Sequence, residues 1–132
     1  MSKSQIYQTV ILEHYRNPKN YGTIENPTVK YRDSNPLCGD TVEIYLKIDD
    51  GKISDIKFSG EGCAISQAGA SMLTEKMKNK SLEEAKKFLK EDMIKLFGNI
   101  NFGPIRIKCA LLAYKVFKMA LYSYLGLKEK EV

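Results

Sequence analysis

The segment 41–49 narrows the choice of fold most, because apolar and polar residues alternate through it without a break. Such alternation is typical of a β-strand with one buried and one exposed face. The apolar face carries Val42, Ile44, Leu46 and Ile48. Asp50-Gly51 follows and indicates a two-residue hairpin, since glycine tolerates positive φ. Residues 53–59 are the predicted return strand, with a bulge near Ser54-Asp55 because Ile53 is out of phase with the apolar residues after it.

Segments with helical spacing of apolar residues lie on both sides of this hairpin. Residues 4–15 form a predicted first helix, and residues 28–32 a short edge strand. Three helices are predicted after the hairpin. They cover residues 65–77, residues 81–97 (from the capping box at Ser81 to Gly98) and residues 104–125 (from Pro104 to Gly126). We therefore predict one α+β domain, residues 1–132, with a small three-stranded antiparallel sheet packed against about four helices.

The composition excludes several classes of protein. The 132 residues are enough for one hydrophobic core, and no apolar run approaches the roughly 18 residues that span a bilayer. The N-terminus lacks the apolar segment of a signal peptide, so we expect a cytoplasmic protein without membrane contact. The net charge is +5, but the lysines are spread along the chain, which favours docking of an acidic protein over nucleic-acid binding.

Three cysteines are the residues best suited to chemistry. Cys38 precedes the first long strand, Cys63 lies between a strand and a helix, and Cys109 lies in the opening turns of the last helix. A helix N-terminus stabilises the thiolate form, and Lys108 would add to a lowering of the Cys109 pKa. Asp40 offers a carboxylate two residues after Cys38, so three thiolates and one carboxylate could complete a tetrahedral metal site.

The residues alone leave two alternatives open for these thiols: they are ligands of one shared site, or they are separate buried core residues. An odd number of cysteines cannot form a closed set of disulfides, and isolated cysteines are commonly small buried core residues. The spacing does not match a zinc finger. The single histidine, His14, is predicted to pack or cap within the first helix rather than to bind a ligand.

The cysteine blocks resemble a known family. Asn-Pro-Leu-Cys-Gly-Asp (35–40), Gly-Glu-Gly-Cys-Ala-Ile-Ser (60–66) and Arg-Ile-Lys-Cys-Ala (106–110) are similar to the three cysteine blocks of U-type iron–sulfur cluster assembly scaffolds (IscU, SufU and the NifU N-terminal domain). The run Glu-His-Tyr-Arg-Asn-Pro-Lys-Asn-Tyr-Gly (13–22) is similar to their N-terminal signature. The resemblance covers residues 5–125, with the blocks in the same order.

This resemblance implies a scaffold on which a 2Fe–2S cluster is assembled and then transferred to apo iron–sulfur proteins. The cluster, or Zn²⁺ in the same place, would be bound by Cys38, Asp40, Cys63 and Cys109, with Asp40 as the weaker ligand that permits release. Sulfur would come from a cysteine desulfurase as persulfide, on Cys38 or Cys109. A homo-oligomer sharing one cluster is a further implication, and no enzymatic activity beyond sulfur acceptance is expected.

The sequence departs from the motifs of both the IscU-type and the SufU-type branch of the family. Lys108 stands where IscU-type members have a histidine, as in SufU-type members, but only 45 residues separate Cys63 from Cys109, so the SufU-type insertion is missing. Phe-Gly-Pro-Ile-Arg (102–106) replaces the chaperone-binding motif Leu-Pro-Pro-Val-Lys, which argues against dependence on an Hsp70-type chaperone. The scaffold is therefore the first hypothesis. The second is a zinc-dependent sulfurtransferase, and the third is a plain binding module with structural thiols.

Overall fold

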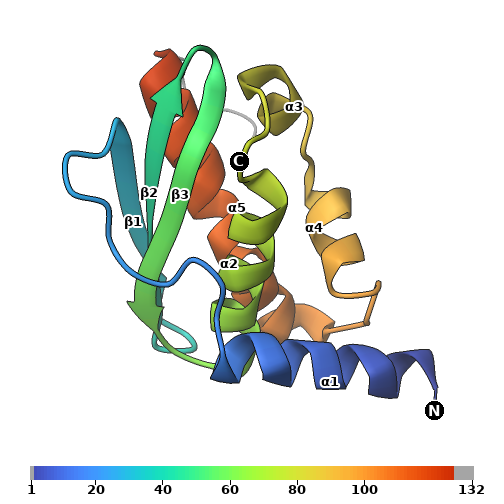
Figure 1. Cartoon of the computed structure of the whole chain (residues 1–132). Helices are drawn as coiled ribbons and strands as arrows, with labels where there is room; N and C mark the ends of the chain where they lie inside the picture. Colours follow the sequence, from blue (N-terminus) through green and yellow to red (C-terminus); the bar gives the residue numbers. More distant parts are fainter. Residues whose placement is uncertain (1, 127–132) are drawn as a thin grey trace.

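A computed structural model describes residues 2–126 of the chain (Figure 1). Three antiparallel strands and five helices make an α+β fold, as predicted. The elements in chain order are α1 (Lys3–Arg16), β1 (Val29–Asn35), β2 (Asp40–Asp49), β3 (Lys52–Glu61), α2 (Ala64–Met77), α3 (Leu82–Lys86), α4 (Lys90–Leu96) and α5 (Gly103–Leu125).

The sheet has the order β1-β2-β3, and its apolar face forms one side of the core. The four alternating residues of β2 are buried, as their spacing predicts. The register between β2 and β3 shifts after the pair Lys47–Asp55, so that Ser54 is the extra residue of a bulge and Ile53 returns to the buried face. β1 is longer than predicted and ends at Asn35, which pairs with Asp40.

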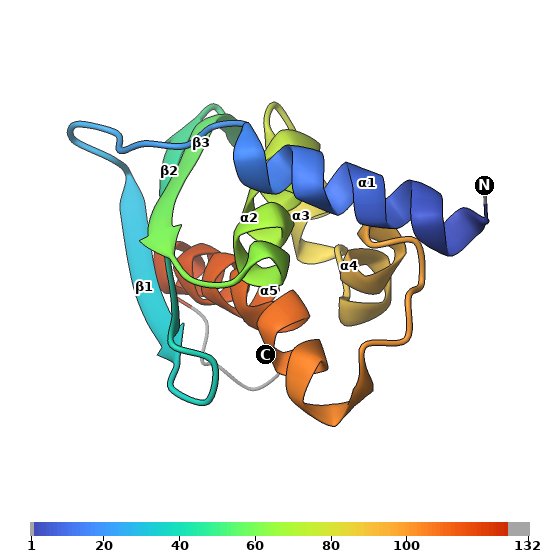
Figure 2. The same cartoon turned by 90° about the horizontal axis from the view of Figure 1, so that it is seen from below.

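The helices form two further layers behind the sheet. α2 and α5 lie against one face of the sheet, and α4 packs on the far side of these two helices (Figure 1). α1 lies across α2 at one end of the molecule, as the view from below shows (Figure 2). α5 contacts β1 and β2 along its length, because nearly every residue from Cys109 to Leu121 is buried. No helix of the described part of the chain is long and apolar enough to cross a membrane.

The single helix predicted for residues 81–97 is wrong, because the structure has two short helices, α3 and α4. The capping box at Ser81 is present, but α3 ends at Lys86. The Lys118 amine of α5 donates hydrogen bonds to the carbonyls of Ala85 and Lys86, at 3.0 and 2.8 Å. These carbonyls would otherwise continue the helix, and Asp92 caps the start of α4 by accepting from the backbone N–H of Leu89.

Candidate metal centre

Cys38 and Asp40 belong to the tip of the β1–β2 hairpin. Asn35 and Asp40 form the last pair of the ladder, and the backbone N–H of Cys38 donates to the Asn35 carbonyl at 3.2 Å, which makes a tight turn. Gly39 has φ +68°, a conformation that glycine adopts without strain. The turn leaves the Cys38 side chain half-buried and the Asp40 side chain fully buried.

Cys63 follows the C-terminal end of β3 and contacts Asp40. It is the N-cap residue of α2, and its backbone N–H donates to Asp40 Oδ1 at 2.7 Å. Its thiol Sγ lies 3.5 Å from Asp40 Oδ2. Gly62 has φ +147°, and a Cβ there would collide with the Asp40 side chain, so only glycine permits this close approach. The Gly-Cys sequence therefore joins Cys63 to the hairpin tip through Asp40.

Cys109 supplies the third thiol from α5. It is fully buried, and its Sγ lies 2.6 Å from Cys38 Sγ. This distance exceeds the roughly 2.05 Å of a disulfide bond, and the cysteines are free. Residues far apart in the sequence thus meet at one place in the fold.

The predicted lowering of the Cys109 pKa is wrong. Burial raises the pKa of this thiol well above its ordinary value, and the neighbouring Cys38, Asp40 and Cys63 groups raise it further. α5 begins at Gly103, so Cys109 lies beyond the first turn, where the helix dipole acts most strongly. Lys108 is exposed and lines a groove described below.

The predicted ligands come together at one site. The ligand atoms of Cys38, Asp40 and Cys109 all lie within 4.8 Å of one another, and Cys63 contacts Asp40. Thiolates are soft ligands that suit zinc and iron, whereas a carboxylate is a harder and more exchangeable ligand. Since the neighbours of Cys109 would be anions when deprotonated, a bound cation would offset the mutual repulsion that raises its pKa.

Asn35 is a polar residue of this site that the sequence prediction missed. Its side-chain amide nitrogen donates toward Cys38 Sγ at 3.6 Å and toward Cys109 Sγ at 3.9 Å. Only 8% of the residue is exposed. The available signal was the Asn-Pro pair at the start of the first cysteine block, since asparagine and proline are typical of the first two positions of a turn.

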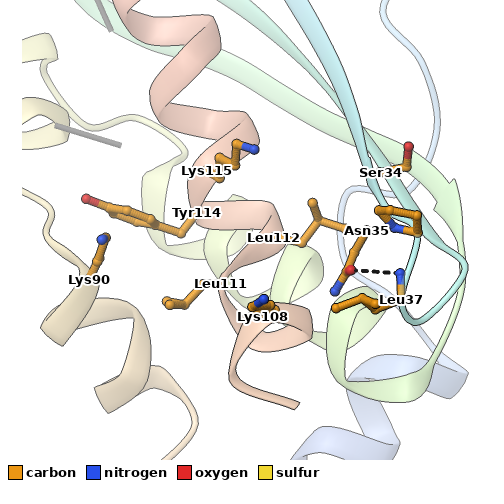
Figure 3. A pocket seen from close by; sticks show the side chains of 10 residues that line it. Ser34, Asn35, Leu37, Lys90, Lys108, Leu111, Leu112, Tyr114 and Lys115 are labelled. Carbon is orange, nitrogen blue, oxygen red and sulfur yellow. Dashed lines mark hydrogen bonds between the residues drawn. The ribbon is translucent and has the colours of Figure 1, made fainter. Parts of the chain in front are cut away.

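A groove of about 440 Å³ lies beside Asn35, between the end of β1 and the first half of α5 (Figure 3). Its lining combines lysine side chains with leucine and tyrosine side chains. The residues are Ser34, Asn35, Pro36, Leu37, Lys90, Lys108, Leu111, Leu112, Tyr114 and Lys115. Lys115 forms an ion pair with Asp33 at 2.9 Å. The groove is therefore apolar with basic groups around it, and Asn35 separates it from the thiols.

His14 packs in the way predicted for it. Its Nδ1 lies 2.7 Å from the Ser71 hydroxyl oxygen on α2, and the same oxygen accepts the backbone N–H of Lys19. These bonds fix the end of α1 and the following segment against α2. Within residues 2–126, the group of side chains close enough to share a metal is Cys38, Asp40 and Cys109, and His14 is not a member.

Comparison with known proteins identifies the family of this chain and agrees with its fold. The family model described as the NifU-like N terminal domain matches residues 6–131. The chain is 36% identical to the zinc-dependent sulfurtransferase SufU of Bacillus subtilis over 129 residues, covering 86% of this chain and 87% of that protein. It is 35% identical to the iron-sulfur cluster assembly scaffold protein IscU 1 of Archaeoglobus fulgidus over 119 residues, covering 90% and 76%.

A solved structure gives the same result at the level of the fold. The crystal structure of FiSufU, a SUF-system protein of Fervidobacterium islandicum AW-1, superposes with a TM-score of 0.77 at 32% identity, covering 91% of this chain and 99% of that one. The resemblance drawn from the cysteine blocks is thus confirmed. The chain belongs to the NifU-like N-terminal domain family, which its IscU and SufU relatives share.

Proposed function

We propose that this protein is a scaffold on which a 2Fe–2S cluster is assembled and from which it is transferred to apo iron–sulfur proteins. The observation that carries the proposal is the convergence of Cys38, Asp40 and Cys109, with Cys63 bonded to Asp40. These four residues come from a hairpin tip, a helix N-terminus and the second turn of a long helix. Four donors from separate elements can bind iron through three thiolates and one carboxylate.

The Asp40 carboxylate supports release as well as binding. Its Oδ1 accepts the backbone N–H of Cys63, so part of its capacity as an acceptor is used within the protein. A carboxylate that is shared in this way is a weaker iron ligand than a thiolate. Asp40 would therefore be the exchangeable position from which the cluster leaves.

The exposure of the cysteines favours Cys38 as the residue that accepts sulfur. A persulfide forms when a thiolate attacks the outer sulfur of the desulfurase's own persulfide and displaces the desulfurase cysteine as a thiolate, so the acceptor must be reachable. Cys38 is half-buried at the hairpin tip, whereas Cys109 is fully buried and its pKa is raised. We propose Cys38 as the first acceptor and Cys109 as a ligand.

The test is anaerobic reconstitution with a cysteine desulfurase, cysteine, ferrous iron and a thiol reductant, which supplies the electrons that convert persulfide sulfur to sulfide beyond those given by iron. We expect the visible absorption of a 2Fe–2S cluster. In a parallel reaction without iron and reductant, mass spectrometry should map one added sulfur to Cys38. Cys38→Ser should lose both signals. Ser123→Ala, an exposed change at the far end of α5, is the control and should load like the wild type. Absence of chromophore and of persulfide in the wild type would contradict the proposal.

A zinc-dependent sulfurtransferase is the second candidate, favoured by the SufU-like Lys108 and by the similarity to B. subtilis SufU. In this function Cys38, Asp40, Cys63 and Cys109 would hold zinc, and Cys38 would be the residue that accepts sulfur. Metal analysis of the native protein separates the two functions. Stoichiometric zinc whose removal by a chelator abolishes sulfur acceptance supports the sulfurtransferase, and iron with labile sulfide supports the scaffold.

The groove beside Asn35 supports the docking of an acidic partner. Lys90 and Lys108 line its apolar surface within reach of the site that holds the cargo. Oppositely charged surfaces accelerate association and depend on salt. We propose that the cysteine desulfurase presents an acidic surface here. Lys90→Glu should slow sulfur transfer several-fold at low salt and less at high salt, without changing metal affinity.

A further inference from the structure

Asn35 connects two of the cysteines that the sequence separates by 71 positions. It lies at the end of β1, nearly buried, where the hairpin tip contacts α5. Its amide nitrogen faces both Cys38 Sγ and Cys109 Sγ, at 3.6 and 3.9 Å. Asp40 is bonded to Cys63, and one of its carboxylate oxygens also lies within 4.8 Å of the Cys38 and Cys109 sulfurs. Asn35 thus contacts two of the four proposed ligands, both of them thiols.

The orientation of the Asn35 amide is determined by its other bonds. Its Oδ1 accepts the backbone N–H of Leu37 at 3.2 Å, as the dashed line in Figure 3 shows. Only the oxygen of the amide can accept a hydrogen bond, so the NH₂ group must face the sulfurs. Its backbone carbonyl accepts the N–H of Cys38. The polar groups of this residue thus hold the turn and present two N–H donors to the thiols.

We infer that Asn35 is a positioning residue that donates N–H···S hydrogen bonds to the metal-bound sulfurs of Cys38 and Cys109, and so increases the affinity for the cargo. The inference rests on the proposed function and adds to it a determinant outside the four ligands. A hydrogen bond to a thiolate stabilises the negative sulfur and withdraws charge from it. The sulfurs of Cys38 and Cys109 would therefore be held firmly, while Asp40 remains the ligand that exchanges.

The chemistry of this position distinguishes asparagine from aspartate. Aspartate has the same shape and keeps an oxygen for the Leu37 N–H. It would place a second carboxylate oxygen, without a donor, against two thiolates. Repulsion between like charges would weaken metal binding, while the turn would keep its hydrogen bonds. Asn35→Asp therefore separates donation to sulfur from support of the turn, and Asn35→Ala removes both.

The test uses Co²⁺ alone as the probe, with the full-length protein under anaerobic conditions. Asn101→Asp is the matched control, because Asn101 is exposed and its Oδ1 likewise accepts a backbone N–H two residues later, that of Gly103. We expect Asn35→Asp to lower Co²⁺ affinity about 10- to 100-fold relative to this control. In Asn35→Ala the sulfur-to-cobalt charge-transfer band should move to longer wavelength, since sulfurs without hydrogen bonds donate more readily.

A measurement on the wild-type protein does not depend on folding of the variants. With ¹¹³Cd²⁺ bound, the Asn35 side-chain amide protons should show a scalar coupling to cadmium through the N–H···S bonds. Two results would overturn this inference alone, provided that the wild type binds cobalt. One is unchanged affinity and spectrum in both Asn35 variants, and the other is absence of the coupling to cadmium. Failure of the wild type to bind cobalt or cadmium at all would overturn the metal site and with it the proposed function.

Discussion

Helix α5 carries two buried polar groups that differ in how the fold treats them. Cys109 is 0% exposed and Lys118 is 1% exposed. The pKa of each is shifted toward its neutral form. Burial raises that of the Cys109 thiol, and burial lowers that of the Lys118 amine to about 8, although the charge of Asp92 opposes this. The same helix thus makes charge costly at two positions, nine residues apart in the sequence.

The neighbours of Lys118 stabilise its charged form, whereas those of Cys109 oppose its charged form. Lys118 donates to two backbone carbonyls at the end of α3 and lies 5.9 and 5.6 Å from the ring centroids of Tyr114 and Tyr122. These are the partners that a buried ammonium requires. Cys109 instead faces Cys38 and Asp40, groups that become anions and oppose its own ionisation. Cys109 is therefore a buried group whose ionisable neighbours oppose its charged form, and such groups are candidates for a functional site.

Cys109→Ser should have the largest effect on function and a small effect on the fold. Loss of one thiolate should lower Co²⁺ or Zn²⁺ affinity by about 100-fold or more, because the hydroxyl is a poor ligand for either ion. Stability without metal should change by only about 1 kcal/mol, since serine is close in size. Metal titration and urea denaturation of the same preparation check both halves. A large loss of stability with normal metal binding would reverse the assignment.

Lys118→Ala should have a large effect on stability and a small effect on metal affinity. The change removes a long buried side chain and the amine that donates to the Ala85 and Lys86 carbonyls, of which Ala85 keeps the backbone N–H of Phe88. The free energy of unfolding should fall by about 2–4 kcal/mol. Metal affinity should stay within about twofold of the wild type, because Lys118 lies away from the thiols along α5. Reduced metal affinity at normal stability would show that the two regions are coupled.

Lys118 also predicts a dependence of stability on pH. The folded pKa of about 8 lies below the ordinary 10.5, so between these values the unfolded chain binds more protons. The burial penalty is fully present below pH 8, and stability rises as the pH increases toward 10.5. Lys118→Met removes the titrating amine but keeps the stem.

Thermal or urea unfolding at several pH values measures this effect as a difference between two proteins. Relative to Lys118→Met, the wild type should gain about 1–3 kcal/mol across the window. Tyr114 faces Lys118 and has a raised pKa, but it is present in both proteins. Parallel pH profiles for wild type and variant would rule out the shift.

Asp40→Ala should have the smallest of these effects, on the lifetime of the cargo. The change removes the ligand that we propose to be exchangeable and one of the groups that raise the Cys109 pKa. We expect a reconstituted cluster to persist several-fold longer in the presence of an apo-acceptor, because one route of exchange is lost. Decay of the visible absorption measures it, and circular dichroism confirms that the fold is retained. Faster loss of the cluster would contradict the role proposed for Asp40.

Much of the fold could be predicted from local patterns in the sequence. The alternation in β2, the turn at Asp50-Gly51, the bulge at Ser54 and the stop of α5 at Gly126 each depend on a few adjacent residues. The break between α3 and α4 could not be predicted in this way. It depends on Lys118, which is more than thirty positions from the carbonyls that it binds.

The candidate site divides along the same line. The four candidate ligands and their chemical types could be read from the sequence, because residue identity and neighbouring glycines are local properties. The raised pKa of Cys109 and the contact of Asn35 with two thiols could be read only from the folded chain. Burial and hydrogen bonding arise between segments that meet only after folding, so the charge state and support of the ligands are properties of the packed molecule.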